Sequence, residues 1–463
     1  MALIKSISGI RGTIGGTAGK NLTPQDIVES TAGFGTMLLK KYKQPLVVIG
    51  RDARISGKLV NNLVCSTLQM MGINVVDLGL STTPTVEVAV VMEKAHAGII
   101  LTASHNPKEW NALKLLNKKG EFISAKDGQT MLSYVKKGGI EYADVDKLGT
   151  YRKDESYIQK HIDSVLALPL VNSTEVSQKK FKIVVDCINS TGAIAIPPLL
   201  NKMGCEVILL NEEMTGDFAH NPEPLPKNLR NLSQAVLTSN AHLGISVDPD
   251  VDRLAFVSED GEMFGEEYTL VAVADYVLKH NKGNTVSNLS STRALRDVTE
   301  KHGGEYHASA VGEVNVVSKM KEVNAVIGGE GNGGIIYPEA HYGRDAIVGI
   351  ALFLSHLAEF GKPVSFLKSS YPQYTISKNK IQLTPEIDID FLLAKLKDKY
   401  RNYPLNTIDG LKIEIDKDWI HLRKSNTEPI IRIYSESNSK VVADNLARKI
   451  QQDVHEILKG VNI

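Results

Sequence analysis

The chain has 463 residues, which is too long for a single hydrophobic core, so two to four domains are expected. Its 53 basic and 53 acidic side chains balance, which excludes binding to nucleic acid or an anionic membrane through overall charge. No uncharged run approaches the roughly 20 residues of a membrane span, and residues 1–12 lack the apolar stretch of a signal peptide, so a cytoplasmic protein is expected.

One pattern occurs three times along the chain: a short β-branched run, a polar or glycine-bearing loop, an amphipathic helix, and a second apolar run. The copies span residues 46–76, 183–210 and, less clearly, 285–307. Glycines such as Gly72 and Gly204 follow the helices and supply their C-caps. Strand-helix-strand order predicts parallel pairing with a right-handed crossover, so these copies are expected to be repeated α/β units.

The C-terminal part of the chain has a different pattern. Residues 376–381 alternate at the strand period after Pro372, which predicts the start of a smaller α+β domain. A final helix over residues 440–458 is predicted because one stripe of it is apolar, consisting of Val442, Leu446, Ile450, Val454 and Ile457.

The first loop that carries chemistry is Thr102-Ala103-Ser104-His105-Asn106-Pro107, which follows the apolar run 98–101. Such a turn exposes Ser104 at the carboxyl end of a strand, where the active sites of open α/β sheets form. A serine hydroxyl needs a base or a charge beside it, and the Gly-x-Ser-x-Gly motif of acyl transfer is absent. Taken alone, the segment is more typical of an ordinary Asn-Pro turn.

The second loop contains Asp248, Asp250 and Asp252, directly after the apolar run 243–247. Three carboxylates this close repel by about 1 kcal/mol per pair even in a water-like dielectric, so the turn favours a bound cation over a solvated acidic turn. Oxygen ligands of this kind suit magnesium. A calcium EF-hand is the rival, but it needs glycine where Arg253 stands and a helix where the strand precedes. Beside a metal, Arg253 is expected to meet a phosphate.

The third loop, residues 328–334, contains five glycines, which let the backbone approach a ligand closely. Glu330 and Asn332 offer a carboxylate and an amide that can bind neighbouring sugar hydroxyls. The spacing matches neither the dinucleotide fingerprint nor a P-loop, so a nucleotide is not expected, and a structural turn remains the alternative.

The fourth loop, residues 423–429, precedes a strand over residues 430–434. With Arg432 of that strand, the loop supplies the ingredients of a phosphate clamp: two guanidiniums, two hydroxyls and an amide, from Arg423, Ser425, Asn426, Thr427 and Arg432. A surface turn with incidental charge is the alternative.

Together and in this order, the loops resemble those of the α-D-phosphohexomutase family, which includes phosphoglucomutase, phosphomannomutase and phosphoglucosamine mutase. The resemblance spans nearly the whole chain. It consists of an N-terminal arginine loop, a phosphoserine loop, a magnesium loop, a sugar-recognition loop and a phosphate loop, at residues 8–12, 102–107, 248–253, 330–334 and 423–429.

This resemblance implies an α/β fold with three similar α/β/α domains of mixed sheets around a central cleft, plus a smaller C-terminal α+β domain. We place the domains at residues 1–150, 151–253, 254–368 and 369–463. A monomer or homodimer is expected.

The resemblance also implies a mechanism. Phosphorylated Ser104 donates its phosphoryl group to a hexose or hexosamine monophosphate, and the resulting 1,6-bisphosphate turns around and returns its other phosphate to the serine. Mg²⁺ would be bound by Ser104, Asp248, Asp250 and Asp252, and an activator of the glucose 1,6-bisphosphate type would start the cycle. The catalytic set also includes Arg11, Lys114, His105 and Arg253. Substrate would be bound by Glu330, Asn332, Arg423, Ser425, Asn426, Thr427 and Arg432.

Departures from the family pattern bear on the substrate. Many members have a serine and a histidine where this chain has Asn332 and Gly334, and a histidine or aspartate where it has Glu313. The segment 341–345 is closest to the phosphoglucosamine mutase and archaeal phosphomannomutase branch. Phosphoglucosamine mutase is therefore the first expectation and phosphomannomutase/phosphoglucomutase the second, while a metal-dependent sugar phosphatase and a calcium or sugar-phosphate binding module are more remote.

Overall fold

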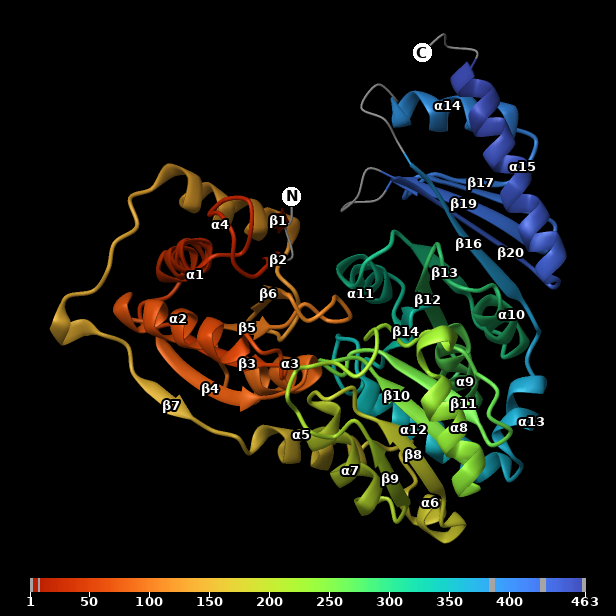
Figure 1. Cartoon of the computed structure of the whole chain (residues 1–463), viewed down its shortest axis with the longest axis horizontal. Coiled ribbons are helices and arrows are strands. Elements are labelled where there is room, and N and C mark those ends of the chain that lie inside the picture. Colours follow the sequence, from red (N-terminus) through yellow and green to blue (C-terminus); the bar gives the residue numbers. More distant parts are fainter. Residues whose placement is uncertain (1–2, 7–8, 383–387, 425–429, 460–463) are drawn as a thin grey trace.

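A computed structural model describes residues 3–6, 9–382, 388–424 and 430–459, and these residues form four sheets in succession along the chain. Figure 1 shows the N-terminal and C-terminal sheets at opposite ends of the molecule, with the second and third sheets between them. Three α/β/α units and a smaller α+β unit are present, which confirms the predicted fold class. In the described ranges, no helix combines the length and the apolar character needed to cross a membrane.

The first unit is a mixed sheet with helices on both faces. Its strands are β1 (Leu3–Ser6), β2 (Gly9–Thr13), β3 (Leu46–Arg51), β4 (Asn74–Leu80), β5 (Ala97–Leu101), β6 (Trp110–Asn117) and β7 (Tyr151–Lys153). Its helices are α1 (Pro24–Leu39), α2 (Gly57–Met70), α3 (Thr83–Met92) and α4 (Ala125–Lys137). The order β1-β2-β6-β5-β3-β4-β7 places β3 parallel to β4, as predicted for the first repeat, and also parallel to β5. One core lies under α1, α2 and α4, and another under α3.

The second and third units each contain a four-stranded sheet among the described residues, in the orders β11-β10-β8-β9 and β13-β12-β14-β15. The second unit comprises β8 (Lys182–Asp186), β9 (Glu206–Leu210), β10 (Leu243–Val247), β11 (Leu254–Ser258), α5 (Tyr157–Leu166), α6 (Ser173–Lys179), α7 (Gly192–Lys202) and α8 (Arg230–Ser239). The third comprises β12 (Asn284–Asn288), β13 (Tyr306–Ser309), β14 (Ala325–Glu330), β15 (Gly334–Ile336), α9 (Glu266–His280), α10 (Ala294–Lys301), α11 (Glu313–Glu322), α12 (Ala346–Phe360) and α13 (Val364–Ser369).

The fourth unit is an antiparallel sheet in the order β16-β20-β19-β18-β17. It comprises β16 (Thr375–Gln382), β17 (Leu405–Asn406), β18 (Leu411–Ile415), β19 (Asp418–Lys424), β20 (Ile430–Ser437), α14 (Ile389–Lys399) and α15 (Lys440–Lys459). The predicted stripe of α15 packs on the sheet through Ile450 and Val454, which are buried, whereas Val442 at its start is exposed.

Two of the predicted domain limits, at residues 150 and 253, each cut off the last strand of a sheet. β7 lies beyond residue 150 yet pairs with β4 of the first sheet, and β11 lies beyond residue 253 yet pairs antiparallel with β10. The limit at residue 253 is displaced because the acidic loop is the turn of a hairpin and does not separate two units.

The second and third units share one apolar core. The ring of Phe353 on α12 stacks on that of Phe256 on β11, with centroids 3.8 Å apart, and Phe264 meets both edge-on. All three rings are buried. The acidic loop therefore stands on a rigid base that the two units build together.

Candidate active site

The decisive contact joins loops from two different sheets. Ser104 follows β5 and Asp248 follows β10, yet the Ser104 hydroxyl donates a 2.7 Å hydrogen bond to Oδ2 of Asp248. Both residues are buried. Predicted loops 144 positions apart in the sequence thus meet through their chemically active atoms.

The three aspartates of the second loop form a compact cluster. Asp248, Asp250 and Asp252 are fully buried, and they offer ligand oxygens that all lie within 4.8 Å of one another. Oδ1 of Asp250 and Oδ1 of Asp252 accept no hydrogen bond, which is costly for buried carboxylate oxygens. A hard divalent cation that takes oxygen ligands satisfies both atoms, so the donor set fits such an ion.

Cationic side chains hold the acidic cluster together. Burial tends to lower the pKa of Lys114, but Asp250 and Asp252, with Nζ–Oδ2 distances of 2.8 and 3.4 Å, raise it above its usual value. Burial raises the pKa of Asp248, and the two neighbouring aspartates raise it further. For Asp252 the effect of burial is outweighed by Arg344 and Lys114, which lower its pKa. Lys114 is therefore protonated, and its positive charge offsets part of the charge of the aspartates.

Both turns carry backbone strain. Ser104 has φ +50° and Val251 has φ +61°, a left-handed conformation that is unfavourable for a residue with a side chain and most so for a β-branched one. Strain of this kind persists only where the surroundings fix the backbone. The two strained residues lie in the two turns that meet.

Arg54, which the sequence analysis missed, fixes the Ser104 turn. Its fully buried guanidinium donates hydrogen bonds of 2.5 to 2.9 Å to the carbonyl oxygens of Ser104, Asn106, Pro107 and Trp110. Asp52 accepts from Nε of Arg54 at 3.0 Å and from the hydroxyl of Thr102 at 2.6 Å. The only signal for Arg54 in the sequence was that polar residues follow β3, the strand that pairs with β5.

His105 faces the Ser104 hydroxyl, with 3.4 Å between Nδ1 and Oγ. Burial, and then the charge of Arg253, lower its pKa well below the usual value. The imidazole is therefore neutral near pH 7, and one of its nitrogens can accept a proton.

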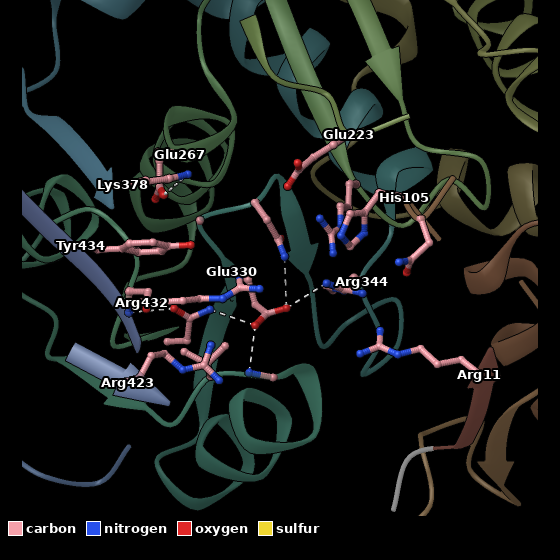
Figure 2. Close-up of a pocket in the computed structure, with 18 of the residues that line it drawn as sticks. Arg11, His105, Glu223, Glu267, Glu330, Arg344, Lys378, Arg423, Arg432 and Tyr434 are labelled. Atoms are coloured by element: carbon pink, nitrogen blue, oxygen red, sulfur yellow. Dashed lines mark hydrogen bonds and ion pairs between the residues drawn. The ribbon is translucent and has the colours of Figure 1, made fainter. Parts of the chain in front are cut away.

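The predicted substrate residues that the structure describes, Glu330, Asn332, Arg423 and Arg432, line a central cavity of about 810 Å³ to which all four units contribute. Figure 2 shows Arg11 pointing into it from one side, Arg423 and Arg432 from the opposite side, and Glu330 between them. Arg253 and His105 also line this cavity. Ser104 and Lys114 line an adjoining cavity of about 490 Å³, to which Arg11, His105, Arg253 and Glu330 contribute as well.

The cavity is suited to anions. Burial lowers the pKa of Arg11, and the charges of Arg253 and Arg432 lower it further. Arg423 and Arg432 stand directly opposite each other on β19 and β20, a like-charge pair that an anion between them would stabilise. Ser425, Asn426 and Thr427 of the predicted clamp lie outside the described residues.

Glu330 is held at both carboxylate oxygens. Oε1 accepts from Nδ2 of Asn288 at 2.9 Å and from the Gly312 amide at 3.1 Å, and Oε2 accepts from Nη1 of Arg344 at 2.8 Å. Asn332 uses its own Oδ1 to accept from the Gly334 amide. The carboxylate is thus oriented before any sugar binds.

Comparison with known proteins settles the family. Four models match in succession, described as phosphoglucomutase/phosphomannomutase α/β/α domain I, domain II, domain III and C-terminal domain, at residues 3–139, 159–261, 265–374 and 383–452. The chain belongs to the phosphoglucomutase/phosphomannomutase family. It is therefore a phosphohexomutase, as the order of its loops predicted.

Similar proteins match over nearly the full length of this phosphohexomutase. A phosphoglucomutase/phosphomannomutase of Thermococcus kodakarensis is 33% identical and covers 97% of this chain and 99% of its own. A probable phosphoglucosamine mutase of Methanopyrus kandleri is 33% identical and covers 98% and 97%. A family protein of Burkholderia thailandensis has a structure that superposes with a TM-score of 0.84 at 26% identity, covering 99% and 97%.

Replacement of Arg54 by methionine should destabilise this phosphohexomutase by roughly 3–5 kcal/mol, because it leaves Asp52 buried without its partner and four carbonyl oxygens without a donor. Urea unfolding measures the change. The control is Arg401→Met, which breaks an exposed ion pair with Asp398 and should cost less than about 1 kcal/mol. Equal, small losses in both variants would show that the Ser104 turn does not depend on Arg54.

Proposed function

We propose that this enzyme interconverts the 1-phosphate and 6-phosphate of an amino hexose, most simply glucosamine, through phosphorylated Ser104 and an enzyme-bound 1,6-bisphosphate. The observation that carries the proposal is the 2.7 Å contact between the Ser104 hydroxyl and Asp248 beside two unsatisfied carboxylate oxygens. A phosphoryl acceptor and a divalent cation site are thereby adjacent, which is what phosphoryl transfer requires.

In the first half of the cycle, a sugar hydroxyl attacks the phosphorus on Ser104. The bond from phosphorus to Oγ breaks, the bond to the sugar oxygen forms, and the sugar proton leaves. Neutral His105 lies against Oγ and can accept a proton, and we assign protonated Lys114, which lines the same cavity as Ser104, to supply one to Oγ. The second half reverses these roles with the other phosphate.

We assign the cation site to Asp248, Asp250, Asp252 and the oxygens of phosphorylated Ser104, and we propose that the cation is Mg²⁺. When bound, Mg²⁺ neutralises charge on the oxygens of the transferring group. Arg253 adds a positive charge next to the transferring group. Its Nε lies 4.0 Å from Asp248 and 3.9 Å from Asp252, and the residue lines the cavity.

The phosphate that does not react is bound on the far side of the cavity. Arg423 and Arg432 supply cationic donors there, and we extend this site to the neighbouring Ser425, Asn426 and Thr427. One anion site that accepts either phosphate lets the bisphosphate bind in two orientations, as the interconversion requires. Glu330 and Asn332 bind sugar hydroxyls between the two ends, and Arg11 stabilises the transferring group.

An amino sugar is favoured by the carboxylates of the cavity. Glu223 and Glu330 line it among the arginines, and a carboxylate suits a protonated 2-amino group. Full-length relatives named probable phosphoglucosamine mutase, from Methanopyrus kandleri and Pyrococcus horikoshii, support the same substrate. The Thermococcus kodakarensis relative makes phosphomannomutase/phosphoglucomutase the second candidate.

Substrate choice is tested by rates with glucosamine 1-phosphate, mannose 1-phosphate and glucose 1-phosphate, each with Mg²⁺ and a trace of glucose 1,6-bisphosphate. We expect the highest kcat/KM with glucosamine 1-phosphate. A higher value with mannose 1-phosphate or glucose 1-phosphate would contradict the proposed substrate but would still be consistent with a mutase. Steady release of inorganic phosphate without 6-phosphate product would instead identify a phosphatase.

Replacement of Ser104 by alanine should abolish turnover, because alanine has no hydroxyl to carry the phosphoryl group. Sugar-phosphate binding should stay within about threefold of the wild-type affinity. Calorimetry measures the binding. Intact mass spectrometry of the wild-type protein should find chains heavier by one phosphoryl group, and peptide mapping should place it on Ser104. Full activity in the variant, or a phosphate on another residue, would refute the mechanism.

A further inference from the structure

Arg344 lies between the acidic loop and the sugar loop, and neither the sequence motifs nor the roles above assign it. It precedes α12, and its side chain is almost fully buried. Nη2 donates to Oδ2 of Asp252 at 2.7 Å, and Nη1 donates to Oε2 of Glu330 at 2.8 Å. One guanidinium therefore joins a proposed cation ligand to the carboxylate proposed to bind the sugar.

Two departures from the family pattern lie against this side chain. Gly334 stands where many members have a histidine, and a Cβ at this position would lie 2.3 Å from Cδ of Arg344. Glu313, the other departure, places Oε2 3.1 Å from Nε of Arg344 and accepts from its backbone amide at 3.1 Å. The glycine gives the arginine room, and the glutamate adds a third carboxylate contact that helps to hold the guanidinium in place.

The contacts that Arg344 makes with Asp252 and Glu330 fix how each carboxylate is oriented. Arg344, together with Lys114 at 3.4 Å, occupies Oδ2 of Asp252, and Oδ1 is left without a hydrogen bond. On Glu330, Asn288 and Gly312 already fix Oε1, and Oε2 accepts from Arg344 at 2.8 Å and, at a longer 3.5 Å, from Nδ2 of Asn332, so Arg344 is the closer contact that directs this oxygen. Both carboxylates are thereby oriented by one rigid, planar group.

We propose that Arg344 is a positioning residue for phosphoryl transfer, which sets the distance between the sugar held at Glu330 and the cation held at Asp252. The inference rests on the proposed function. A guanidinium can span two carboxylates because its donors sit on separate nitrogens in a fixed fork, whereas a lysine offers a single nitrogen. Misplacement of the reacting groups by about 1 Å can cost on the order of 100-fold in rate.

The test compares Arg344→Lys with Arg296→Lys. Arg296 is a matched control because it also places two nitrogens on a carboxylate, at 3.0 and 2.8 Å from Glu414, but it does not line the central cavity. We expect Arg344→Lys to lower kcat on the order of 100-fold with KM changed by less than about threefold, and Arg296→Lys to keep kcat within about twofold. The thermal midpoints of both variants are measured alongside.

A second set of variants separates positioning from folding. Gly334→Ala keeps every charge but displaces the stem of Arg344, so kcat should fall; in an Arg344→Ala background the same change should have almost no further effect. Near wild-type kcat in Arg344→Lys, an equal loss in Arg296→Lys, or additive effects of Gly334→Ala and Arg344→Ala would each overturn the inference. Wild-type protein inactive on all three sugar 1-phosphates would instead refute the proposed function.

Discussion

The site depends on the burial of three carboxylates in one turn. Asp248, Asp250 and Asp252 are removed from water within one hairpin, where their mutual repulsion and lost hydration are costly unless positive charge is close. Lys114 and Arg344 supply part of that charge, and Arg253 lies at the edge of the cluster. The two oxygens that still lack a partner are the strongest structural argument for a divalent cation.

The arrangement of the units follows from this constraint. Lys114 comes from the first unit, Arg344 from the third, and the acidic turn from the second, so the charges of this one turn are balanced by side chains from two other units. The shared core beneath β11 and α12 fixes the turn and Arg344 on one base. The fourth unit adds Arg423 and Arg432 across the cavity from Arg11 (Figure 2).

Sequence reasoning located the turns because their signals are local. An apolar strand followed by Ser104 or by the acidic run is visible in a few residues, and the carboxyl ends of strands are where such turns gather. Arg54 and Arg344 were missed as site residues because the contacts that give them a role are not local: Arg54 binds the Ser104 carbonyl 50 positions away, and Arg344 binds Asp252 92 positions away. The limit at residue 253 was misjudged for a related reason, since a hairpin turn and a domain linker both end a strand.

The most direct measurement is a crystal structure of the protein loaded with Mn²⁺ in place of Mg²⁺, with the ion located by its anomalous scattering. We predict one ion bound by carboxylate oxygens of Asp248, Asp250 and Asp252 together with Oγ or a phosphoryl oxygen of Ser104. An ion bound instead at the buried group of His161, His341 and Asp345, with the three aspartates left free of metal, would contradict the account.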